Sequence, residues 1–354
     1  MRRVLAGAAA GAAFAAMAAA DGFITVDGSA EAKYGAALAE QDTVTGFGNS
    51  DLGVTGWANG SELDAGFAFL DIGGDALYLV LAGNLESNFN KLEVFIDTGI
   101  PGQNQLRGDN ADVDFNGLNR MGHLDDMNPG LKFDEDFEAS FWFSATCGNP
   151  NGAGIFALYA NAALLAPEGG APGAYLGTCG DGEVIVSALG IDVAINNSNT
   201  RGVSGGASGS GSGAGVTTGV EIKIPLSLMG YSKGPIKVCA FINGSSHDYM
   251  SNQVLGGVGG LQNLSCGPDS CNWVDIRTID LSTIPGNQYF VIGDLPETCP
   301  ADFNDDGVVD GDDLGALLGQ WGDCLGCEAD FNDDGVVDGD DLGSLLGEWG
   351  ECPV

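Results

Sequence analysis

The sequence ADFNDDGVVDGDDLG fills residues 301–315 and recurs without a change at residues 329–343. The repeat extends on both sides, because Cys299–Gly326 and Cys327–Val354 align without a gap at a period of 28 residues. A repeat of this kind indicates two copies of one small structural unit in tandem. The repeat therefore decides the fold of the C-terminal tail and is the starting point for the rest of the chain.

Each copy places oxygen-bearing side chains at alternate positions, with a glycine at the sixth position, where a tight turn is needed. Oxygen ligands at this spacing wrap one Ca²⁺ with about 6–8 contacts, whereas Mg²⁺ demands a stricter octahedral geometry. An acidic, solvated turn is the alternative. The predicted ligands are, in the first loop, Asp302, Asn304, Asp306, the Val308 carbonyl, Asp310 and Asp313, and in the second loop Asp330, Asn332, Asp334, the Val336 carbonyl, Asp338 and Asp341.

A short amphipathic helix is predicted after each loop. In the first copy, apolar side chains recur with helical spacing at Leu314, Leu317, Leu318 and Trp321, and the second copy repeats the pattern up to Trp349. We expect both tryptophans to lie in the core between the helices. The linker between the loops leaves no room for a helix that enters the second loop, so a helix–loop–helix EF-hand of the calmodulin kind is excluded.

These two loop–helix units resemble a type I dockerin over about the last 56 residues. The resemblance implies two EF-hand-like units that pack antiparallel about a pseudo-two-fold axis, folding driven by calcium, and docking onto a cohesin-like or cell-surface partner. Dockerins usually carry a hydroxyl or small apolar pair at loop positions 10 and 11. The chain has Gly311-Asp312 and Gly339-Asp340 there.

The nine cysteines are typical of a protein from an oxidising compartment, and four of them lie in the tail. Two pairings respect the repeat, either Cys299–Cys324 with Cys327–Cys352, or Cys299–Cys352 with Cys324–Cys327. We favour the second, because it joins adjacent chain ends. The other five cysteines include at least one that is unpaired or bonded to another chain, and we expect Cys239 to be a buried free thiol.

The N-terminus has the layout of a secretory signal peptide. Arg2 and Arg3 precede an apolar run from Val4 to Met17, and residues 18–20 are three alanines suited to cleavage. A buried alanine-rich helix is the alternative. We expect a signal peptide over residues 1–20, a mature chain that begins at Asp21, and a secreted, extracellular or cell-surface protein.

The formal net charge of −37, from 49 acidic and only 12 basic residues, excludes several partners. Nucleic acids and anionic membranes need clustered cations, which the chain lacks. After residue 20, no stretch approaches the length of a membrane span. Divalent cations are the natural partners of such a chain.

From residue 21 to 296 the sequence predicts one domain of short β-strands. Runs rich in β-branched and aromatic residues alternate with turns, and no long helical pattern separates them. We therefore expect a mainly β protein with an antiparallel, jelly-roll-like β-sandwich, followed at residues 299–354 by the small all-α tail module. We expect the Gly/Ser-rich tract at residues 202–215 to be a loop between neighbouring strands.

Three patches, Ile24–Ala39, Lys91–Thr98 and Gly219–Tyr231, are similar to family 9 carbohydrate-binding modules and their DOMON-like relatives. The resemblance implies an antiparallel sandwich and, by analogy, sugar binding. The tryptophans of this region are candidates for sugar platforms by residue type, but core packing is the more common fate of such residues. They are Trp57, Trp142 and Trp273.

A third calcium site is a weaker hypothesis. Asp112, Asp114 and Asn116 copy the first half of a calcium loop, and either Asp97 or Asp109 would complete it. A solvated turn is the alternative.

Catalysis has little support in the sequence, which contains two histidines and no Ser/His/Asp arrangement, phosphate-binding loop or zinc-protease motif. A glycosidase needs only a pair of carboxylates. The acids on or beside predicted strands are Glu93, Asp97, Asp136 and Glu221.

The sequence thus favours a secreted calcium-binding protein with a docking tail and a non-catalytic sandwich that serves polysaccharide binding or catabolism. One alternative is a polysaccharide-active hydrolase that carries the same tail. A further alternative is an extracellular structural or surface-attached protein.

Overall fold

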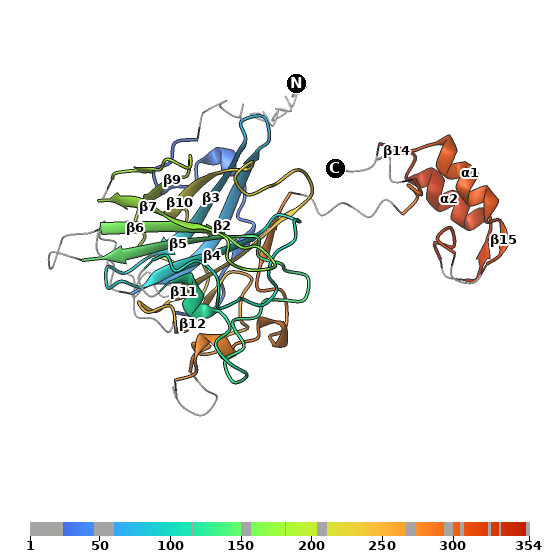
Figure 1. The fold of residues 1–354 in the computed structure, drawn as a ribbon. Helices are drawn as coiled ribbons and strands as arrows, with labels where there is room; N and C mark the ends of the chain where they lie inside the picture. Colours follow the sequence, from blue (N-terminus) through green and yellow to red (C-terminus); the bar gives the residue numbers. More distant parts are fainter. Residues whose placement is uncertain are drawn as a thin grey trace, which may run out of the picture.

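The protein is mainly β, as expected, and its sheets are antiparallel (Figure 1). The computed structural model describes residues 24–45, 60–114, 117–149, 157–180, 182–203, 211–266, 273–293, 300–304, 308–324, 327–332 and 334–351. The predicted signal peptide, residues 1–20, lies outside these ranges. No helix within them is long and apolar enough to cross a membrane.

The first sheet has the strand order β1-β2-β3-β10-β9-β8. The Gly/Ser-rich tract connects β9 to β10, which pair directly, as Glu221 opposite Ala194 shows. The strands are β1 (Ala39–Glu40), β2 (Glu62–Asp71), β3 (Ala76–Asn84), β8 (Ile185–Val186), β9 (Asp192–Ile195) and β10 (Gly219–Pro225).

The second sheet has the order β12-β11-β4-β5-β6-β7, and β13 also pairs with β11. Its strands are β4 (Lys91–Asp97), β5 (Phe141–Gly148), β6 (Ala157–Leu164), β7 (Gly173–Cys179), β11 (Ile236–Asn243), β12 (Met250–Val254) and β13 (Phe290–Ile292). The 3₁₀ turns found among the described residues lie outside the strands, at Ala32–Tyr34, Leu118–Met121, Ile276–Thr278 and Leu281–Thr283.

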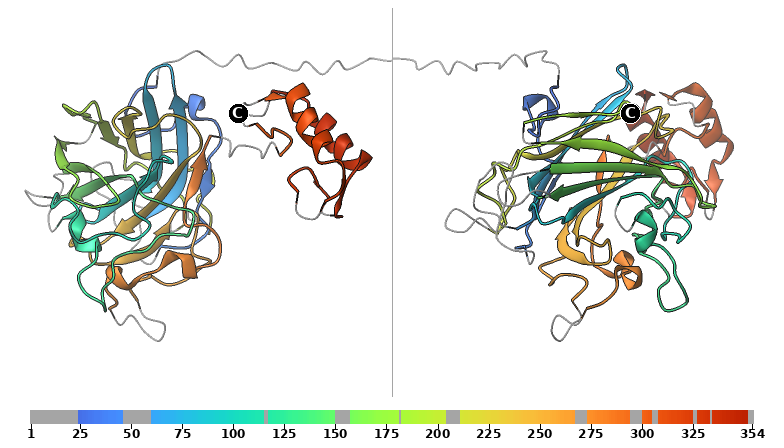
Figure 2. Two further views of the ribbon diagram at one scale, coloured as in Figure 1. Left: turned by 45° about the vertical axis from the view of Figure 1, so that its right-hand side comes forward. Right: turned by 60° about the vertical axis from the view of Figure 1, so that its left-hand side comes forward.

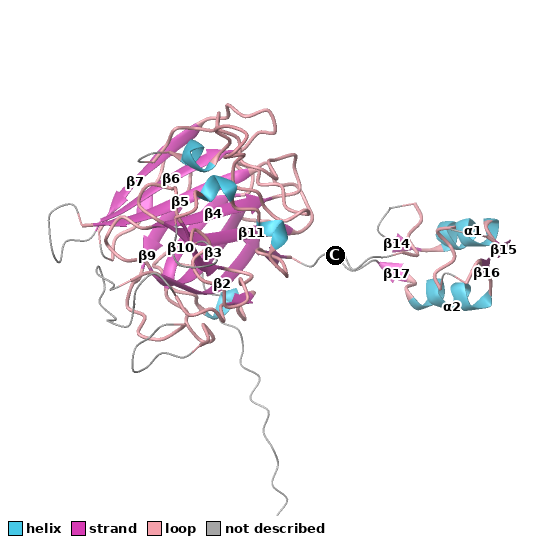
Figure 3. Cartoon of the chain, turned by 90° about the horizontal axis from the view of Figure 1, so that it is seen from below, coloured by secondary structure: helices cyan, strands magenta, loops and turns pink. Residues whose placement is uncertain are grey.

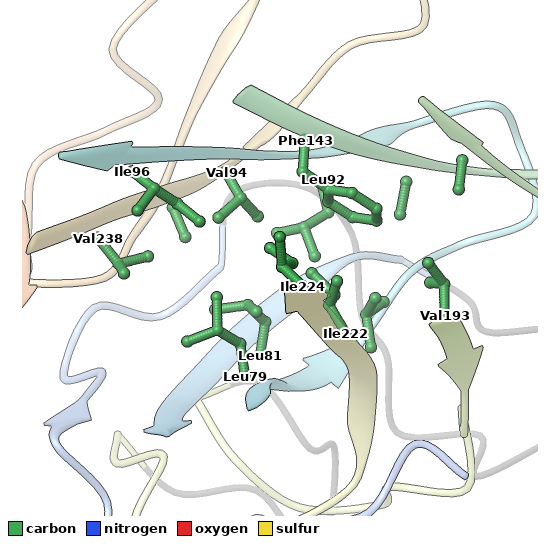
Figure 4. Packing of buried hydrophobic residues seen from close by; sticks show 14 of the residues in the cluster. Leu79, Leu81, Leu92, Val94, Ile96, Phe143, Val193, Ile222, Ile224 and Val238 are labelled. Atoms are coloured by element: carbon green, nitrogen blue, oxygen red, sulfur yellow. The ribbon is translucent and has the colours of Figure 1, made fainter. Parts of the chain in front are cut away.

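The main core forms where side chains of the two sheets meet. Alternate residues of a strand point to opposite faces, so Leu92, Val94 and Ile96 of β4 face the same way. Figure 4 shows them opposite Leu79 and Ile222 of the first sheet. The two sheets therefore pack face to face around one apolar layer.

A second core covers part of the outer face of the second sheet. Phe95, Trp142 and Phe241 point away from the main core and pack against residues 106–139 and 254–289. These two connecting segments lie side by side, because Lys132 donates its backbone N–H to Ile279 and accepts from Leu281. Figure 2 shows them together on one flank of the domain.

One buried carboxylate joins the N-terminal segment to the first sheet, in addition to backbone hydrogen bonds such as that from Ala30 to Thr217. Glu221 of β10 accepts hydrogen bonds from the backbone nitrogens of Asp27 and Gly28 at 2.7 and 2.8 Å and from the Tyr34 hydroxyl at 2.6 Å. Burial raises the pKa of Glu221, and the hydrogen bond from Tyr34 opposes this shift. Two of the three patches that resemble carbohydrate-binding modules thus meet at Glu221, which gives them a structural role.

The tail, from Pro300, has its own core and an internal symmetry. α1 (Gly311–Gly319) and α2 (Gly339–Gly347) lie against each other, and the strand of each loop pairs with the segment that follows the other helix (Figure 3). Those pairs are β14 (Val308–Val309) with β17 (Gly350–Glu351) and β15 (Gly322–Asp323) with β16 (Val336–Val337). Phe303 and Phe331 stack at 6.0 Å between ring centroids.

The expectation that Trp321 and Trp349 lie in the tail core is wrong. Each is 49% exposed, whereas Leu317 and Leu345 are fully buried. The reason is helix length: α1 ends at Gly319 and α2 at Gly347, so each tryptophan lies beyond the helix and does not continue its apolar stripe.

The cysteines agree with only part of the expectation. Cys324 and Cys327 form a disulfide, as the favoured pairing predicts, while Cys299 and Cys352 lie outside the described residues. Cys239 is a buried free thiol, but so are Cys147 and Cys179. The latter two both flank Leu158, from strands on either side of it. Strand spacing sets them roughly 9.5 Å apart, too far for a disulfide.

Candidate functional site

Two rows of polar and aromatic side chains cross the outer face of the second sheet. Strand register aligns Lys91 with Thr146 and Tyr159 in one row. It aligns Glu93, Ser144, Asn161 and Tyr175 in the next. All of these positions alternate with the apolar residues that face the core. The sheet therefore presents a polar strip across four adjacent strands.

The Lys91 ammonium lies at the floor of this strip and is paired with Asp114 from the 98–140 connection. Nζ lies 3.1 Å from Asp114 Oδ2 and 3.0 Å from Thr146 Oγ1. The hydroxyls of Ser144 and Thr146 donate to the same carboxylate oxygen at 3.1 and 3.0 Å. Both charged side chains are at least nine-tenths buried. A buried ion pair needs such additional hydrogen bonds to offset the desolvation of its charges.

A second acid–base pair lies behind the first. His247 Nδ1 is 2.6 Å from Glu93 Oε1, and Nε2 lies 3.3 Å from Asp114 Oδ2 without the alignment of a hydrogen bond. Glu93 also accepts from Trp142 Nε1 at 2.8 Å and Asn243 Nδ2 at 3.1 Å. Burial lowers the pKa of His247, but the charge of Glu93 and the contacts with both carboxylates outweigh burial, so its pKa is raised. With His247 protonated, the four groups carry two positive and two negative charges.

Backbone strain concentrates at this network. Among the described residues, four that are not glycine have a positive φ in the left-handed region, and three of them lie here: Phe89 at 71°, Asp114 at 64° and His247 at 57°. Asp and His tolerate this conformation better than Phe, for which it is an outlier. Each such residue costs about 1–3 kcal/mol and persists where the surroundings hold it, commonly at functional sites.

A pocket of about 660 Å³ opens above the network. This volume lies within the usual range for small-molecule sites, about 300–1,000 Å³. Phe89 is held over Gly148, where an added Cβ would lie 2.4 Å from its ring. The pocket is lined by Asn88, Phe89, Lys91, Asp114, Thr146, Tyr159, Asn161, Tyr175 and Ser245.

One lining group has an unused hydrogen-bond donor. Asn161 is only 2% exposed, and its Nδ2 has no hydrogen-bond acceptor among the described residues. A buried amide without a partner is costly, and most such groups in proteins find one. A ligand that presents an acceptor oxygen in the pocket would satisfy it.

The described residues of the predicted calcium loops accept several backbone hydrogen bonds. In the second loop, Asp330 accepts from the backbone nitrogens of Asp334 at 3.1 Å and Gly335 at 2.9 Å, so the loop turns around its carboxylate. Asn332 and Asp334 also accept backbone N–H groups of the loop, those of Asp334 and Val336.

The last predicted ligand of each loop lies at the start of a helix. Asp313 and Asp341 are buried, and each accepts from the backbone near both ends of its loop, at Phe303 and Asp310 and at Phe331 and Asp338. The backbone N–H of Asp338 holds the pKa of Asp341 below its usual value. Asp310 and Asp338 cap the helices.

All of these donors are hard oxygens, which fits Ca²⁺. Within the described residues, however, no three acidic, histidine or cysteine side chains meet closely enough to form a metal site. Asp306 of the first loop lies outside those residues. The calcium ligands therefore stay a prediction.

The acids proposed for a third calcium site have other partners or lie elsewhere in the structure. Asp114 is directed into the sheet against Lys91, Asp109 pairs with Arg107 at 2.7 Å, and Asp97 lies at the far end of β4. The structure does not bring Asp97 or Asp109 to Asp114, and Asn116 lies outside the described residues.

Two of the four candidate catalytic acids lie in one depression, and the other two lie elsewhere. Glu93 is buried beneath the pocket, Asp97 and Asp136 line a different depression, and Glu221 belongs to the other sheet. Only one carboxylate, that of Asp114, lines the main pocket among the described residues. No pair suited to glycoside hydrolysis lies in it.

The expectation that the tryptophans of residues 21–296 pack in the core is confirmed for one of them and wrong for another. Trp142 is fully buried, as expected for core packing, but Trp273 is 55% exposed, so the expectation for it is wrong. Trp57 lies outside the described residues. Sequence reasoning missed Phe89, Tyr159, Asn161 and Tyr175 altogether. The alternation of polar and apolar residues within β4, β5 and β6 was the available signal, but it does not show which strands are neighbours.

Comparison with known proteins adds no relative: no family model, no curated protein and no solved structure matches the chain.

Proposed function

We propose that the chain is an extracellular saccharide-binding protein whose second sheet carries the binding pocket and whose tail is a calcium-folded docking module. The observation that supports this most directly is the composition of the pocket. Three aromatic rings and several amide, hydroxyl and charged groups converge on one depression of ligand size.

A sugar ring has an apolar C–H face and hydroxyl groups around its edge. The rings of Phe89 and Tyr175, 41% and 58% exposed, offer the flat apolar surfaces that such a face contacts. A hydroxyl both donates and accepts, so it satisfies Asn161 Nδ2 while it donates to an oxygen of the floor. Exposed aromatics beside buried, unsatisfied polar groups are the combination that a polyol needs.

The two sheets that pack around one core are consistent with the sandwich architecture of carbohydrate-binding modules, which we propose for residues 21–296. The jelly-roll connectivity and the likeness to family 9 modules belong to the same proposal. A non-catalytic role is favoured over hydrolysis, because one carboxylate in the pocket does not provide an acid and a nucleophile.

For the tail we propose two bound Ca²⁺ ions and attachment to a cohesin-like or cell-surface partner. The pairing of β14 with β17 and of β15 with β16 supports the pseudo-two-fold arrangement that the dockerin resemblance implies. Leu318, Trp321, Leu346 and Trp349 are each about half exposed and supply apolar surface of the kind that docking uses. Polysaccharide utilisation at the cell surface would join the two activities.

The proposal is tested by affinity electrophoresis of the mature chain through gels that contain soluble polysaccharides, in the presence of Ca²⁺. We expect retardation by at least one polysaccharide, and loss of retardation in Tyr175→Ala. Exposed Val186→Ala on β8 is the matched control, because it also removes exposed apolar surface but lies away from the pocket. Equal mobility of the wild type in all gels contradicts saccharide binding.

A further inference from the structure

The charges that line the pocket compensate each other. Lys91 and Asp114 are the only charged residues in its described lining, and their ionic groups are 3.1 Å apart. Immediately behind them, Glu93 and His247 form a second close pair at 2.6 Å, in which the charge of Glu93 is compensated when His247 is protonated. A ligand in the pocket therefore meets no uncompensated charge.

A negatively charged ligand is disfavoured at this floor. Its carboxylate would compete with Asp114 for Lys91 and would place two like charges within a few ångströms, at a site shielded from water. The chain adds a long-range repulsion, because its formal net charge is −37. Nothing in the described lining offers a second cation in compensation.

A positively charged ligand is disfavoured for the converse reason. Asp114 Oδ2 already contacts Lys91 and accepts from the hydroxyls of Ser144 and Thr146. A ligand cation would have to displace the buried ammonium of Lys91, which would then lose its counter-charge.

An uncharged hydroxyl meets neither obstacle. The ammonium of Lys91 has three N–H donors, of which Asp114 and Thr146 receive two. The amide of Asn161 supplies a further donor without an acceptor. Lys91 on β4 and Asn161 on β6 lie in adjacent rows of the strip, with β5 between them, and both line the same pocket.

We infer that the pocket selects uncharged saccharides over those that carry carboxylates, and that the Lys91–Asp114 pair determines this selectivity. The inference rests on the proposed saccharide binding. In this inference Asp114 determines specificity, because its negative charge compensates the positive charge of the Lys91 ammonium, which donates hydrogen bonds at the pocket floor.

The test is calorimetric titration of the mature chain with neutral gluco-, xylo-, manno- and galacto-oligosaccharides and with uronic acid oligosaccharides of the same lengths, at one fixed ionic strength. We expect a neutral oligosaccharide to bind at least tenfold more tightly than any uronic acid oligosaccharide. In Asp114→Asn, which leaves Lys91 unneutralised, this preference should narrow by at least tenfold. Asn tolerates the positive φ at position 114. Asp126→Asn, an exposed change of the same charge, should leave the preference unaltered.

Each outcome decides a different point. Equal or tighter binding of uronic acid oligosaccharides by the wild type overturns the inference but leaves saccharide binding intact. Binding of neither class overturns both. An unchanged preference in Asp114→Asn overturns the role of the pair. If that variant does not fold, the wild-type comparison still decides the ligand class.

Discussion

The ammonium nitrogen of Lys91 lies 3.1 Å from a carboxylate oxygen of Asp114. The two residues are 23 positions apart in the sequence, Lys91 on β4 and Asp114 in the connection that follows it. Both are buried at the floor of the pocket, where Ser144 and Thr146 also donate to Asp114. The pair thus fixes the 98–140 connection to the sheet and sets the charge that a ligand meets. Stability and selectivity depend on the same contact.

Replacing Lys91 with methionine should destabilise the domain strongly. The change removes the closest counter-charge of the buried Asp114, while His247 stays 3.3 Å away, and breaking a buried pair typically costs about 3–5 kcal/mol. Urea unfolding followed by circular dichroism measures the effect. The matched control is Lys223→Met, because Lys223 and Asp192 form a partly exposed pair at 3.5 Å, worth about 0–1 kcal/mol. Similar losses in the two variants would show that Lys91–Asp114 is no more than a surface pair.

Asp64 should make the stability of the protein depend on pH. Burial and the neighbouring Glu62 raise the pKa of Asp64 to about 9, while hydrogen bonds from Val203 and Asn199 oppose the shift. The folded state therefore binds a proton that the unfolded chain releases near pH 4. The stabilisation is complete below that pH and is lost progressively as the pH rises towards 9.

The variant Asp64→Asn mimics the protonated side chain and removes this titration. Between pH 5 and pH 9, the wild type should lose unfolding free energy relative to the variant, because only the wild type has Asp64 to deprotonate. Urea unfolding at several pH values measures it. Parallel pH profiles would contradict a protonated Asp64 in the native state.

Calcium should bind the tail with a stoichiometry of two ions per chain. Calorimetric titration of the chelator-treated mature chain measures this, and helix content should rise on addition of calcium. Asp313→Ala with Asp341→Ala should abolish binding, because each removes the last ligand of a loop. Asp323→Asn, an exposed change outside the ligand set, is the control. Unaltered binding in the double variant would exclude the predicted ligand set.

The exposed tryptophans should contribute little to tail stability. Trp321→Ser and Trp349→Ser should each change the unfolding free energy by less than about 0.5 kcal/mol, because both side chains are half exposed. Leu317→Ala, at a fully buried position, should cost about 2–5 kcal/mol. The unfolding free energies of these variants are compared by urea unfolding at saturating calcium, followed by the helical circular dichroism signal. A tryptophan variant as unstable as Leu317→Ala would place that ring in the core.

The sequence predicts much of the fold where the local pattern alone decides. The runs around Ala76–Gly83, Lys91–Thr98 and Ile236–Ile242 become β3, β4 and β11 with small shifts at their ends. The longest strand, β2, is hard to recognise from the sequence, because its outward residues include buried acids such as Glu62 and Asp64, which are uncommon in strands. β7 is also hard to recognise, because its glycine and alanine residues weaken the strand pattern.

The pocket could not be predicted, because its parts are brought together by strand order. Lys91, Thr146 and Tyr159 become neighbours only when β4, β5 and β6 pair in this register. Asp114 was considered a calcium ligand, since the sequence shows its acidic neighbours but not the buried lysine opposite. The tail shows the same limit at Trp321: the spacing predicts a helical face, but the helix ends before it reaches the residue.

Saccharide binding in the pocket is tested most directly at Asn161, whose buried amide has an unused donor. The measurement is the affinity of wild type and Asn161→Ala for the tightest neutral oligosaccharide, by calorimetry with both chains shown to be folded. The account predicts a loss of roughly threefold to tenfold, the effect of one neutral hydrogen bond. Equal affinities would contradict it, because a ligand in this pocket would then leave the amide without a partner.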